Sequence, residues 1–520
     1  MSETFKEFSK KPWLLSLTAG VLLGLAWPPV NLPILQFPAF LLLFMLLKHC
    51  RTVREVILYT YPGLILWNTI TTYWLVMATL TGGIAAILAN SLLMLIPLLW
   101  IRKLMHSSAQ AFWFAPVAAA VWTSYEFLHH RWDLAWNWLA LGNGWAELPY
   151  LVHYISWTGY LGISFWIVLT SAFLWQAVRQ PVPRRLYMLL ASILIFPLLS
   201  MLAMNTTPNP ESPHPPIEVA VIQPNLDSYI DLGGFENADE VVTSLLEQTN
   251  VVRTRNTRLI LWPENALESV VTLDSRHVDR IRDSVRVWNS TLITGSGYLQ
   301  TYEERVPKVV RGYRNGVPWN VYNAALHFSP DGQVSVYKKG RLVPVVERLP
   351  FAEFFQGLDR AGWVDWGSLT GYGRGEEAVN FPVGPLYTPA LICYDSVFPE
   401  WVREFVTGGA DFLTIITNDG WWGYTSGHIQ HFAFARLRAI ETQRWIARSA
   451  NNGISGIIGP DGTIHRKTDY WVQDAFTATI EPNSRLTPYM RFGDWFNLLV
   501  LALALLGSLI PAFRKTDSNA

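Results

Sequence analysis

The residues of this chain that could do chemistry stand at the ends of strand-like apolar runs in its second half. Cys393, one of only two cysteines in 520 residues, ends the run Ala390–Cys393, and Glu264 and Lys339 each follow a similar run. Strand ends are where α/β folds collect catalytic groups. A thiol, a carboxylate and an ammonium together supply a nucleophile, a general base and an oxyanion stabiliser, which is the set that acyl transfer needs.

Each of these residues also has a purely structural explanation when it is taken singly. A lone cysteine packs well as a small apolar side chain, Glu264 fits a surface turn, and Lys339 fits a solvated strand end. Cys393 precedes the segment Phe398–Trp401, so we expect it at a strand-to-helix turn. There the helix N-terminus would lower the thiol pKa and favour the thiolate. Spacing along the chain does not place the three groups together.

The composition is that of a membrane protein. Half of the residues are apolar and only 15% are charged, against about 25% charged in an ordinary soluble domain. The 25 tryptophans suit a protein that crosses the membrane-water interface. The formal net charge of zero gives no support to nucleic-acid binding, and two cysteines exclude a disulfide framework.

Hydrophobic runs long enough to cross a bilayer, about 20 residues, are concentrated in the first 204 residues. We expect seven transmembrane helices there and an eighth near the C-terminus. The first run is too long for a signal peptide and has no small-residue cleavage site, so we expect it to be retained. The expected spans are residues 12–30, 33–48, 56–79, 83–101, 110–128, 150–178, 186–204 and 493–513.

The basic residues of the short loops predict the orientation. If the eight spans alternate, almost all of these residues fall on one side of the membrane, and Arg131 alone falls on the other. The positive-inside rule makes the basic side cytoplasmic, so residues 205–492 are expected outside. The basic residues concerned are Lys6, Lys10, Lys11, Lys48, Arg51, Arg54, Arg102, Lys103, Arg179, Arg184, Arg185, Arg514 and Lys515.

Residues 205–492 follow a different pattern, which predicts one layered α/β domain between a membrane domain (1–204) and a C-terminal helix and tail (493–520). The segment opens with a proline-rich stretch that we expect to be extended. Apolar runs of strand length then alternate with helical periodicity. Strands are expected at residues 219–223, 259–262, 291–295, 324–328, 334–337, 390–393, 412–417 and 454–458, and helices at 238–255, 277–288 and 429–446.

Several sequence blocks resemble the nitrilase superfamily and, together with the membrane spans, the bacterial apolipoprotein N-acyltransferase family. The resemblance covers nearly the whole chain. The chain departs from the family pattern at Val345–Val346, where Phe-Gly is usual, and at Asp395, where Glu is frequent. The blocks are Trp262–Glu264, Tyr337–Glu347, Cys393–Asp395, Thr417–Gly423, Gln430–His431, Ala435–Glu441 and Arg448–Ser455.

The resemblance implies a helical membrane bundle of about eight spans joined to an extracytoplasmic, nitrilase-like α-β-β-α sandwich. It implies a bacterial inner-membrane enzyme, monomeric and without metal or cofactor, with its catalytic domain in the periplasm. A phospholipid would donate an acyl chain, through a cysteine thioester, to the N-terminal amine of a diacylglyceryl-cysteine apolipoprotein. The implied roles are Cys393 as nucleophile, Glu264 as general base, Lys339 as oxyanion stabiliser, Glu347 as supporting carboxylate, and Tyr394, Asp395, Trp421 and Trp422 as substrate-binding residues.

Two other functions compete with this transferase. A membrane-tethered amidase of the same superfamily would pass the acyl group to water, and a silent scaffold would lack one of the catalytic groups. Residues 129–138, 363–366 and 421–422 are aromatic segments that could contact lipid. His428 and His431 lie at i, i+3 without a further His or Cys cluster nearby, which favours a packing or helix-surface role over metal ligation.

Overall fold

The computed structural model describes residues 11–108, 112–206, 214–267, 269–360 and 371–516. By its internal contacts the chain divides into two compact units. The first contains residues 1–207 together with 492–520, and the second contains residues 208–491. The expected aromatic segment 363–366 lies outside the described residues.

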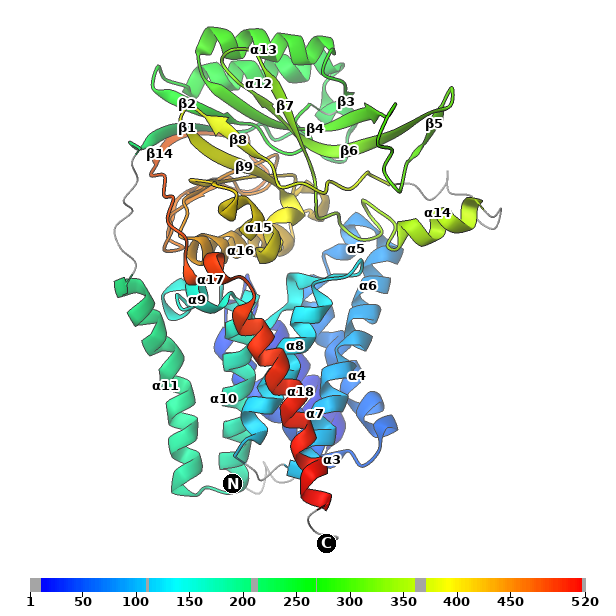
Figure 1. Cartoon of the computed structure of the whole chain (residues 1–520), viewed down its shortest axis with the longest axis vertical. Coiled ribbons are helices and arrows are strands. Elements are labelled where there is room, and N and C mark those ends of the chain that lie inside the picture. The colour runs from blue at the N-terminus through cyan, green and yellow to red at the C-terminus, as the bar shows by residue number, and fades with distance from the viewer. Residues whose placement is uncertain (1–10, 109–111, 207–213, 268, 361–370, 517–520) are drawn as a thin grey trace. The chain divides into compact units, whose positions relative to one another are not determined.

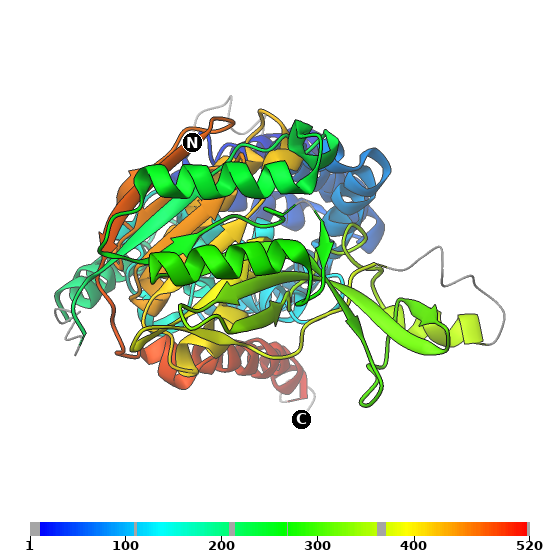
Figure 2. The ribbon, with the colours of Figure 1, turned by 90° about the horizontal axis from the view of Figure 1, so that it is seen from above.

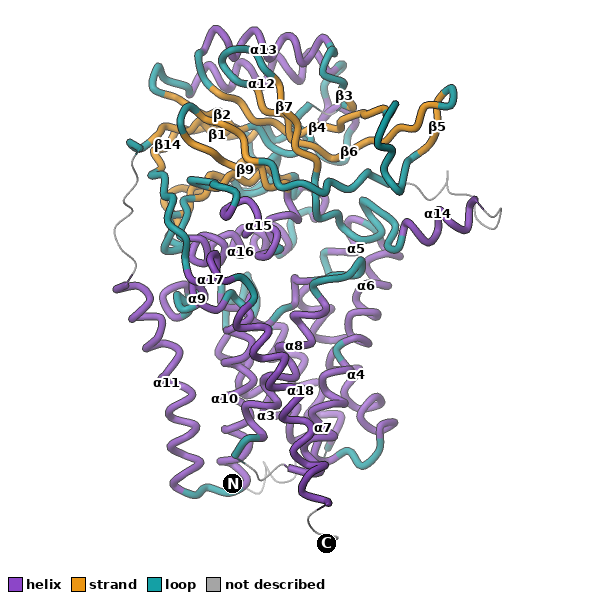
Figure 3. Tube along the Cα trace, in the orientation of Figure 1, coloured by secondary structure: helices purple, strands orange, loops and turns teal. Residues whose placement is uncertain are grey.

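The first unit is helical throughout, as Figures 1 and 3 show. Helix α4 begins with a capping box, in which the Thr52 side chain accepts from the Glu55 backbone N–H and Glu55 accepts from the Thr52 N–H. The main helices are α2 (Pro12–Gly24), α3 (Gln36–His49), α4 (Val53–Thr72), α6 (Leu80–Leu93), α7 (Leu95–Ser108), α8 (Phe114–His129), α10 (Leu161–Arg179), α11 (Pro183–Thr206) and α18 (Trp495–Thr516).

Within the described residues, three helical stretches are long and apolar enough to cross a membrane: Leu80–His106, Leu161–Arg179 and Pro183–Asn205. The helices at the other expected spans do not meet both conditions of length and apolar composition, so the number eight stays a prediction. The first expected span ends early, because α2 stops at Gly24 and the chain turns at Trp27–Pro29. Prolines cannot continue a helical hydrogen-bond ladder.

Helices α2 and α4 approach each other closely through glycine. A Cβ atom on Gly20 would lie 2.3 Å from the Gly63 carbonyl oxygen, so any side chain there would force the helices apart. The Gly63 N–H donates to the Ser16 hydroxyl at 3.1 Å. This bond crosses between helices next to Pro62, which itself has no N–H to give. Small residues at the contact are typical of helix packing in membranes.

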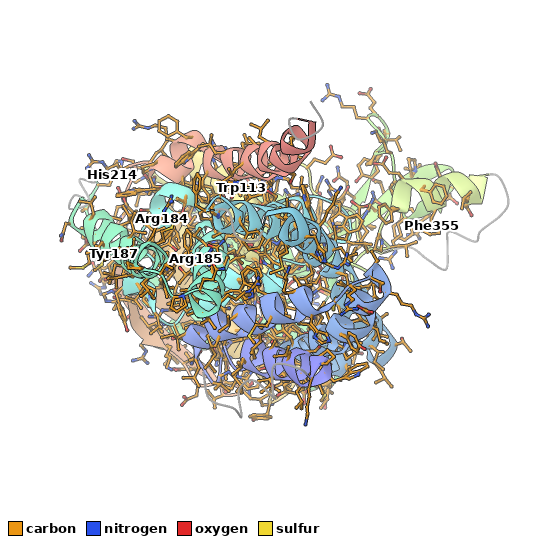
Figure 4. The ribbon with its side chains drawn as sticks, turned by 90° about the horizontal axis from the view of Figure 1, so that it is seen from below. Trp113, Arg184, Arg185, Tyr187, His214 and Phe355 are labelled. Atoms are coloured by element: carbon orange, nitrogen blue, oxygen red, sulfur yellow. The ribbon has the colours of Figure 1, made fainter. Side chains whose placement is uncertain are left out.

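The basic loops of the first unit gather at one end of its helices. Arg102, near the end of α7, donates to the backbone carbonyls of Cys50 and Arg51. The Arg184 guanidinium lies 5.5 Å from the Phe112 ring centroid, which brings the start of α11 to the start of α8. Figure 4 labels Arg184 and Arg185 close to Trp113 in the view of this end.

The aromatic loop 129–138 has two different environments. Trp138 is buried and packs on Trp74, with ring centroids 4.8 Å apart. Trp132 is 40% exposed, next to Arg131, which pairs with Asp494 just before α18. The exposed residues 131–133 could contact lipid, whereas Trp138 has a packing role.

The second unit contains two mixed sheets. The larger, eight-stranded sheet has the order β14-β1-β2-β4-β6-β5, with β3 paired to β4 and β7 paired to β6. The smaller, six-stranded sheet has the order β13-β12-β11-β10-β9-β8. The strands are β1 (Ile217–Gln223), β2 (Thr257–Leu261), β3 (Val270–Val271), β4 (Thr291–Thr301), β5 (Gly312–Arg314), β6 (Val317–Phe328), β7 (Val334–Lys338), β8 (Asn380–Val383), β9 (Leu386–Ile392), β10 (Leu413–Thr417), β11 (Ile446–Ala450), β12 (Gly456–Ile458), β13 (Ile464–Lys467) and β14 (Asp474–Ile480).

The two sheets pack on each other, and helices cover both outer faces. Helices α12 (Ala238–Val252) and α13 (Arg276–Trp288) lie side by side over the larger sheet, as Figure 2 shows. Helices α15 (Pro399–Thr407) and α16 (Gly427–Thr442) cover the smaller sheet. The second unit is therefore an α-β-β-α sandwich, which confirms the expected fold of this region.

The sequence predicted the apolar strands better than the polar ones. The helix expected at 429–446 was wrong at its end, because α16 stops at Thr442 and Ile446 already begins β11. Gln443 adopts a left-handed backbone (φ 50°) that ends the helix. Strand β11 was missed because it carries Arg448 and Ser449, which interrupt the apolar pattern on which the prediction depended.

Candidate active site

The carboxyl ends of parallel strands bring the candidate residues together. Strands β9, β10 and β11 are parallel neighbours, with Ile392 opposite Ile416 and Thr417 opposite Ala450. The residues that follow β9 and β10 therefore leave the sheet at the same edge. Glu264 follows β2 in the larger sheet, and Gly295 lets it approach, since a Cβ there would lie 2.5 Å from the Glu264 Cα atom.

Lys339 lies between two carboxylates. Its Nζ atom is 3.2 Å from Glu264 Oε1 and 2.8 Å from Glu347 Oε1, and only 1% of its side chain is exposed. Burial by itself would lower the pKa of Lys339, but Glu264 and Glu347 raise it well above its ordinary value. Lys339 is therefore a permanent cation. The neighbouring Lys338 instead lies over the Tyr322 ring, 4.7 Å from its centroid.

Both oxygens of Glu264 are held by hydrogen bonds. Oε1 accepts from Asn323 Nδ2 at 2.7 Å as well as from Lys339, and Oε2 accepts from the Asn418 backbone N–H at 2.8 Å. Asn323 also donates to Glu347 Oε1 at 2.9 Å. These contacts fix the orientation of Glu264, as a general base requires. Glu347 is anchored further by the Val343 N–H at 2.7 Å, so the departure at Val345–Val346 leaves it in contact with Lys339.

Cys393 begins the short 3-10 helix η7 (Cys393–Val397), directly after β9. Its backbone is left-handed, with φ 46°, a conformation that costs a non-glycine residue about 1–3 kcal/mol. The side chain is partly buried. Glu264, Lys339, Asp419 and Thr417 are all close enough to act on its pKa.

The expected resting thiolate is not supported. Burial raises the pKa of the Cys393 thiol well above its ordinary value, the Glu264 carboxylate raises it further, and Lys339 only partly opposes them. The prediction from helix N-terminal charge was wrong because only the short 3-10 helix η7 follows Cys393, while burial and the Glu264 carboxylate both disfavour the thiolate. The thiol is therefore neutral at rest, and its proton must leave during attack.

Tyr394 and Asp395, expected to bind substrate, are buried in the chain. Asp395 is completely buried, accepts from the Tyr337 hydroxyl at 2.8 Å, and receives the Ile392 and Arg341 backbone N–H groups at 3.1 and 2.8 Å. Burial raises the pKa of Asp395 to about 6, although Lys339 and these hydrogen bonds lower it. These contacts fit a residue that holds the nucleophile turn better than one that contacts lipid.

Trp421 and Trp422 lie on η8 (Gly420–Trp422), close after the Asn418 N–H that binds Glu264. Trp421 is 44% exposed and packs edge-on against Tyr229 at 6.1 Å. Trp422 packs against the His431 ring at 5.7 Å. Trp421 is exposed and Trp422 is half-buried, so both stay candidates for substrate contact.

A second buried polar group lies next to Cys393. Asp419 Oδ2 accepts from Arg448 Nη2 at 2.8 Å, and Asp419 Oδ1 lies 2.9 Å from His431 Nδ1 and accepts from Thr417 at 2.7 Å. The Cys393 sulfur, a His431 nitrogen and an Asp419 oxygen lie within 4.8 Å of one another, a grouping that could hold a metal ion. The Arg448 cation, 3.1 Å from His431 Nδ1, opposes the binding of a second cation there.

Sequence reasoning named Glu264, Lys339, Glu347 and Cys393, and the structure places the first three in contact. It assigned no role to Asn323, which carries no motif, or to the Asn418 N–H, which lies within the block Thr417–Gly423. It also treated His431 as a packing residue. The buried polar group around His431 could have been suspected from the blocks Thr417–Gly423 and Arg448–Ser455, which contain Asp419 and Arg448.

Two family models match this chain. Residues 218–489 match the carbon-nitrogen hydrolase family, and residues 19–173 match the apolipoprotein N-acyltransferase N-terminal domain. A solved carbon-nitrogen hydrolase superfamily protein from Xanthomonas campestris is 18% identical and covers 54% of this chain and 99% of its own, with a TM-score of 0.39.

Relatives named apolipoprotein N-acyltransferase match over almost the whole length. The relative from Chlorobaculum tepidum is 31% identical over 529 residues, covering 97% of each chain. The relative from Geobacter metallireducens is 26% identical and covers 98% of this chain and 97% of its own. The chain therefore belongs to the apolipoprotein N-acyltransferase family.

Proposed function

We propose that Cys393, Glu264 and Lys339 carry out the N-acylation of lipoproteins for which this family is named. In the first half-reaction the Cys393 sulfur attacks the ester carbonyl of a phospholipid while Glu264 takes the thiol proton. Lys339 stabilises the oxyanion that forms. Collapse of the tetrahedral intermediate passes the proton to the departing lysophospholipid oxygen and leaves a thioester on Cys393.

In the second half-reaction the N-terminal amine of a diacylglyceryl-cysteine apolipoprotein attacks that thioester. Glu264 accepts a proton from the amine, Lys339 again stabilises the oxyanion, and the thiolate leaves and is reprotonated. The product is an amide. One observation carries this proposal: a buried lysine held between two carboxylates, one of which, Glu264, lies near the Cys393 thiol. The supporting role of Glu347 is to hold that lysine.

We further propose that the two compact units correspond to a membrane domain and a periplasmic catalytic domain in the bacterial inner membrane. The gathering of Arg102, Arg51 and Arg184 at one end of the first unit supports a cytoplasmic end, with eight spans in all. Arg131, the one basic loop residue expected on the opposite side, pairs with Asp494, so its charge counts less against the proposed orientation. All the proposed catalytic groups come from one chain, so a monomer suffices.

The function is tested by measuring lysophospholipid release from purified enzyme in detergent micelles. With a phosphatidylethanolamine and phosphatidylglycerol mixture and no acceptor, the enzyme should release about one equivalent and then stall. Adding a synthetic diacylglyceryl-cysteine peptide should restart release. Cys393→Ala should release none, and the control Cys50→Ala should behave like the wild type. Rapid continuous release of free fatty acid without the peptide would identify a hydrolase instead.

The orientation is tested by cysteine labelling in a Cys50→Ala, Cys393→Ala background. Glu304, an exposed residue of the second unit, is changed to cysteine and treated with an impermeant maleimide on spheroplasts. Lys48→Cys, an exposed position in the last turn of α3 at the basic end of the first unit, serves as the matched control. We expect Glu304→Cys to react at once and Lys48→Cys only after the membrane is broken. The opposite order would refute the proposed topology.

A further inference from the structure

The buried group formed by Thr417, Asp419, His431 and Arg448 has no part in the chemistry proposed above. All four side chains are at most 1% exposed, although three of them can carry a charge. Burying charged groups is costly unless they are paired and hydrogen-bonded. The Asp419 carboxylate is paired with Arg448 at 2.8 Å and accepts from Thr417 at 2.7 Å, so this group is neutralised internally.

The imidazole of His431 connects this group to the nucleophile. Its Nδ1 atom faces Asp419 Oδ1 at 2.9 Å and Arg448 Nη2 at 3.1 Å. Its Nε2 atom faces the Cys393 carbonyl oxygen at 3.3 Å and the Ser396 hydroxyl, also at 3.3 Å. The ring therefore bridges a fixed ion pair and the backbone of the reacting residue.

The protonation of Nε2 follows from its neighbours. A carbonyl oxygen can only accept a hydrogen bond, and the single Ser396 hydroxyl proton already goes to the Cys393 carbonyl at 2.7 Å. With the hydroxyl proton in that direction these two neighbours accept, and the Nε2–H tautomer can donate to the Cys393 carbonyl. At Nδ1 either state is accommodated, since Asp419 can accept and Arg448 can donate.

A hydrogen bond to the Cys393 carbonyl would stabilise a strained part of the backbone. Cys393 has a left-handed backbone with φ 46°, which persists only where surrounding groups hold it. Asp395 holds the N-terminal side of the turn through the Ile392 N–H. Ser396 and His431 hold the carbonyl on the other side. Without the second anchor the backbone could relax and carry the sulfur away from Glu264 and Lys339.

We propose that His431 is a positioning residue, whose Nε2–H holds the Cys393 carbonyl and so fixes the strained turn that presents the thiol. The Asp419–Arg448 pair fixes the ring. This inference rests on the proposed role of Cys393 as nucleophile. It assigns His431 no contact with substrate and no proton transfer, which distinguishes it from Glu264.

The test compares His431→Gln with His431→Asn. A glutamine amide reaches the position of Nε2 and can still donate to the Cys393 carbonyl, whereas an asparagine amide reaches only the position of Nδ1. Misplacing a reacting group by about 1 Å costs on the order of 100-fold in rate. We expect acyl-enzyme formation to fall about 100-fold in His431→Asn and about tenfold or less in His431→Gln, with the phospholipid KM unchanged in both.

Two further measurements complete the test. Alkylation of Cys393 by iodoacetamide, in a Cys50→Ala background, needs no substrate and should rank the two variants in the same order. His428→Gln, one turn earlier on α16 and stacked on Tyr470 at 3.6 Å, should keep wild-type acylation. An asparagine variant as active as the glutamine variant would overturn the positioning role. Absence of any acyl adduct in the wild type would instead overturn the proposed function. The alkylation rates of the two His431 variants would still test the positioning role in that case.

Discussion

Two buried charged clusters lie next to Cys393, and they are balanced differently. In the first, Lys339 faces two carboxylates, Glu264 and Glu347, so negative charge is in excess. In the second, Asp419 faces Arg448, and the charges cancel. Removing one member of a balanced buried pair leaves the other charge without compensation, whereas Lys339 has a second carboxylate to pair with. In the proposed mechanism the first cluster moves protons and the second holds the backbone.

The comparison predicts its largest effect for the first cluster. Glu264→Gln keeps the shape of the side chain but cannot take the thiol proton, so acyl-enzyme formation should fall about 100- to 10,000-fold. Burst measurements of lysophospholipid release would show this loss. Glu304→Gln is the matched control and should have no effect, because Glu304 is exposed in the loop between β4 and β5. Wild-type bursts from Glu264→Gln would remove it as the base.

The second cluster should respond in stability. Asp419→Asn leaves Arg448 buried without its carboxylate, and breaking a buried pair in this way costs about 3–5 kcal/mol. Glu264→Gln should cost less, because Lys339 keeps Glu347 at 2.8 Å. Thermal unfolding in detergent, followed by tryptophan fluorescence, gives both values. Equal losses of Tm in the two variants would mean that the clusters do not differ in the way proposed.

A smaller effect concerns the pH dependence of the thiol. Because burial and Glu264 raise the pKa of Cys393, the thiol is neutral at pH 7, and the thiolate fraction grows as the pH rises. The rate of iodoacetamide alkylation should therefore increase throughout pH 7 to 9, at about tenfold per pH unit. A plateau at or below pH 7 would show that the thiolate is the resting form after all.

The same measurement sharpens the role of Glu264. Since its carboxylate raises the pKa of Cys393, Glu264→Gln should lower that pKa and speed alkylation at pH 8. Acyl transfer in the same variant should be lost. Faster alkylation with lost transfer would separate the electrostatic effect of Glu264 from its work as a base, and slower alkylation would contradict the assigned direction.

The sequence predicted the parts of this arrangement that leave a local signal. The apolar runs predicted at 390–393 and 259–262 located the buried strands β9 and β2, and Cys393 and Glu264 were predicted at or near the ends of these runs. Strand β11 left no such signal, because Arg448 and Ser449 are polar yet completely buried. Their burial depends on partners from other strands, which no local pattern reveals.

The membrane unit shows the same limit. Hydropathy found the apolar helices α10 and α11, but not where the chain turns within an apolar run. The expected span 150–178 contains a turn at Gly159, with φ 73°, and its long helix begins only at Leu161. Such turns are set by backbone geometry and by packing, which mean hydropathy does not measure.

Mass spectrometry of the intact enzyme tests the central claim most directly. After incubation with phospholipid and no acceptor, the wild type should gain the mass of one acyl chain, located on Cys393 by peptide mapping. The adduct should disappear when a diacylglyceryl-cysteine peptide is added, with the acyl chain recovered on the peptide amine. The account would be contradicted if a Cys393→Ala enzyme formed acylated peptide. It would also be contradicted by an acyl adduct on another residue that disappears as fast as the acylated peptide forms.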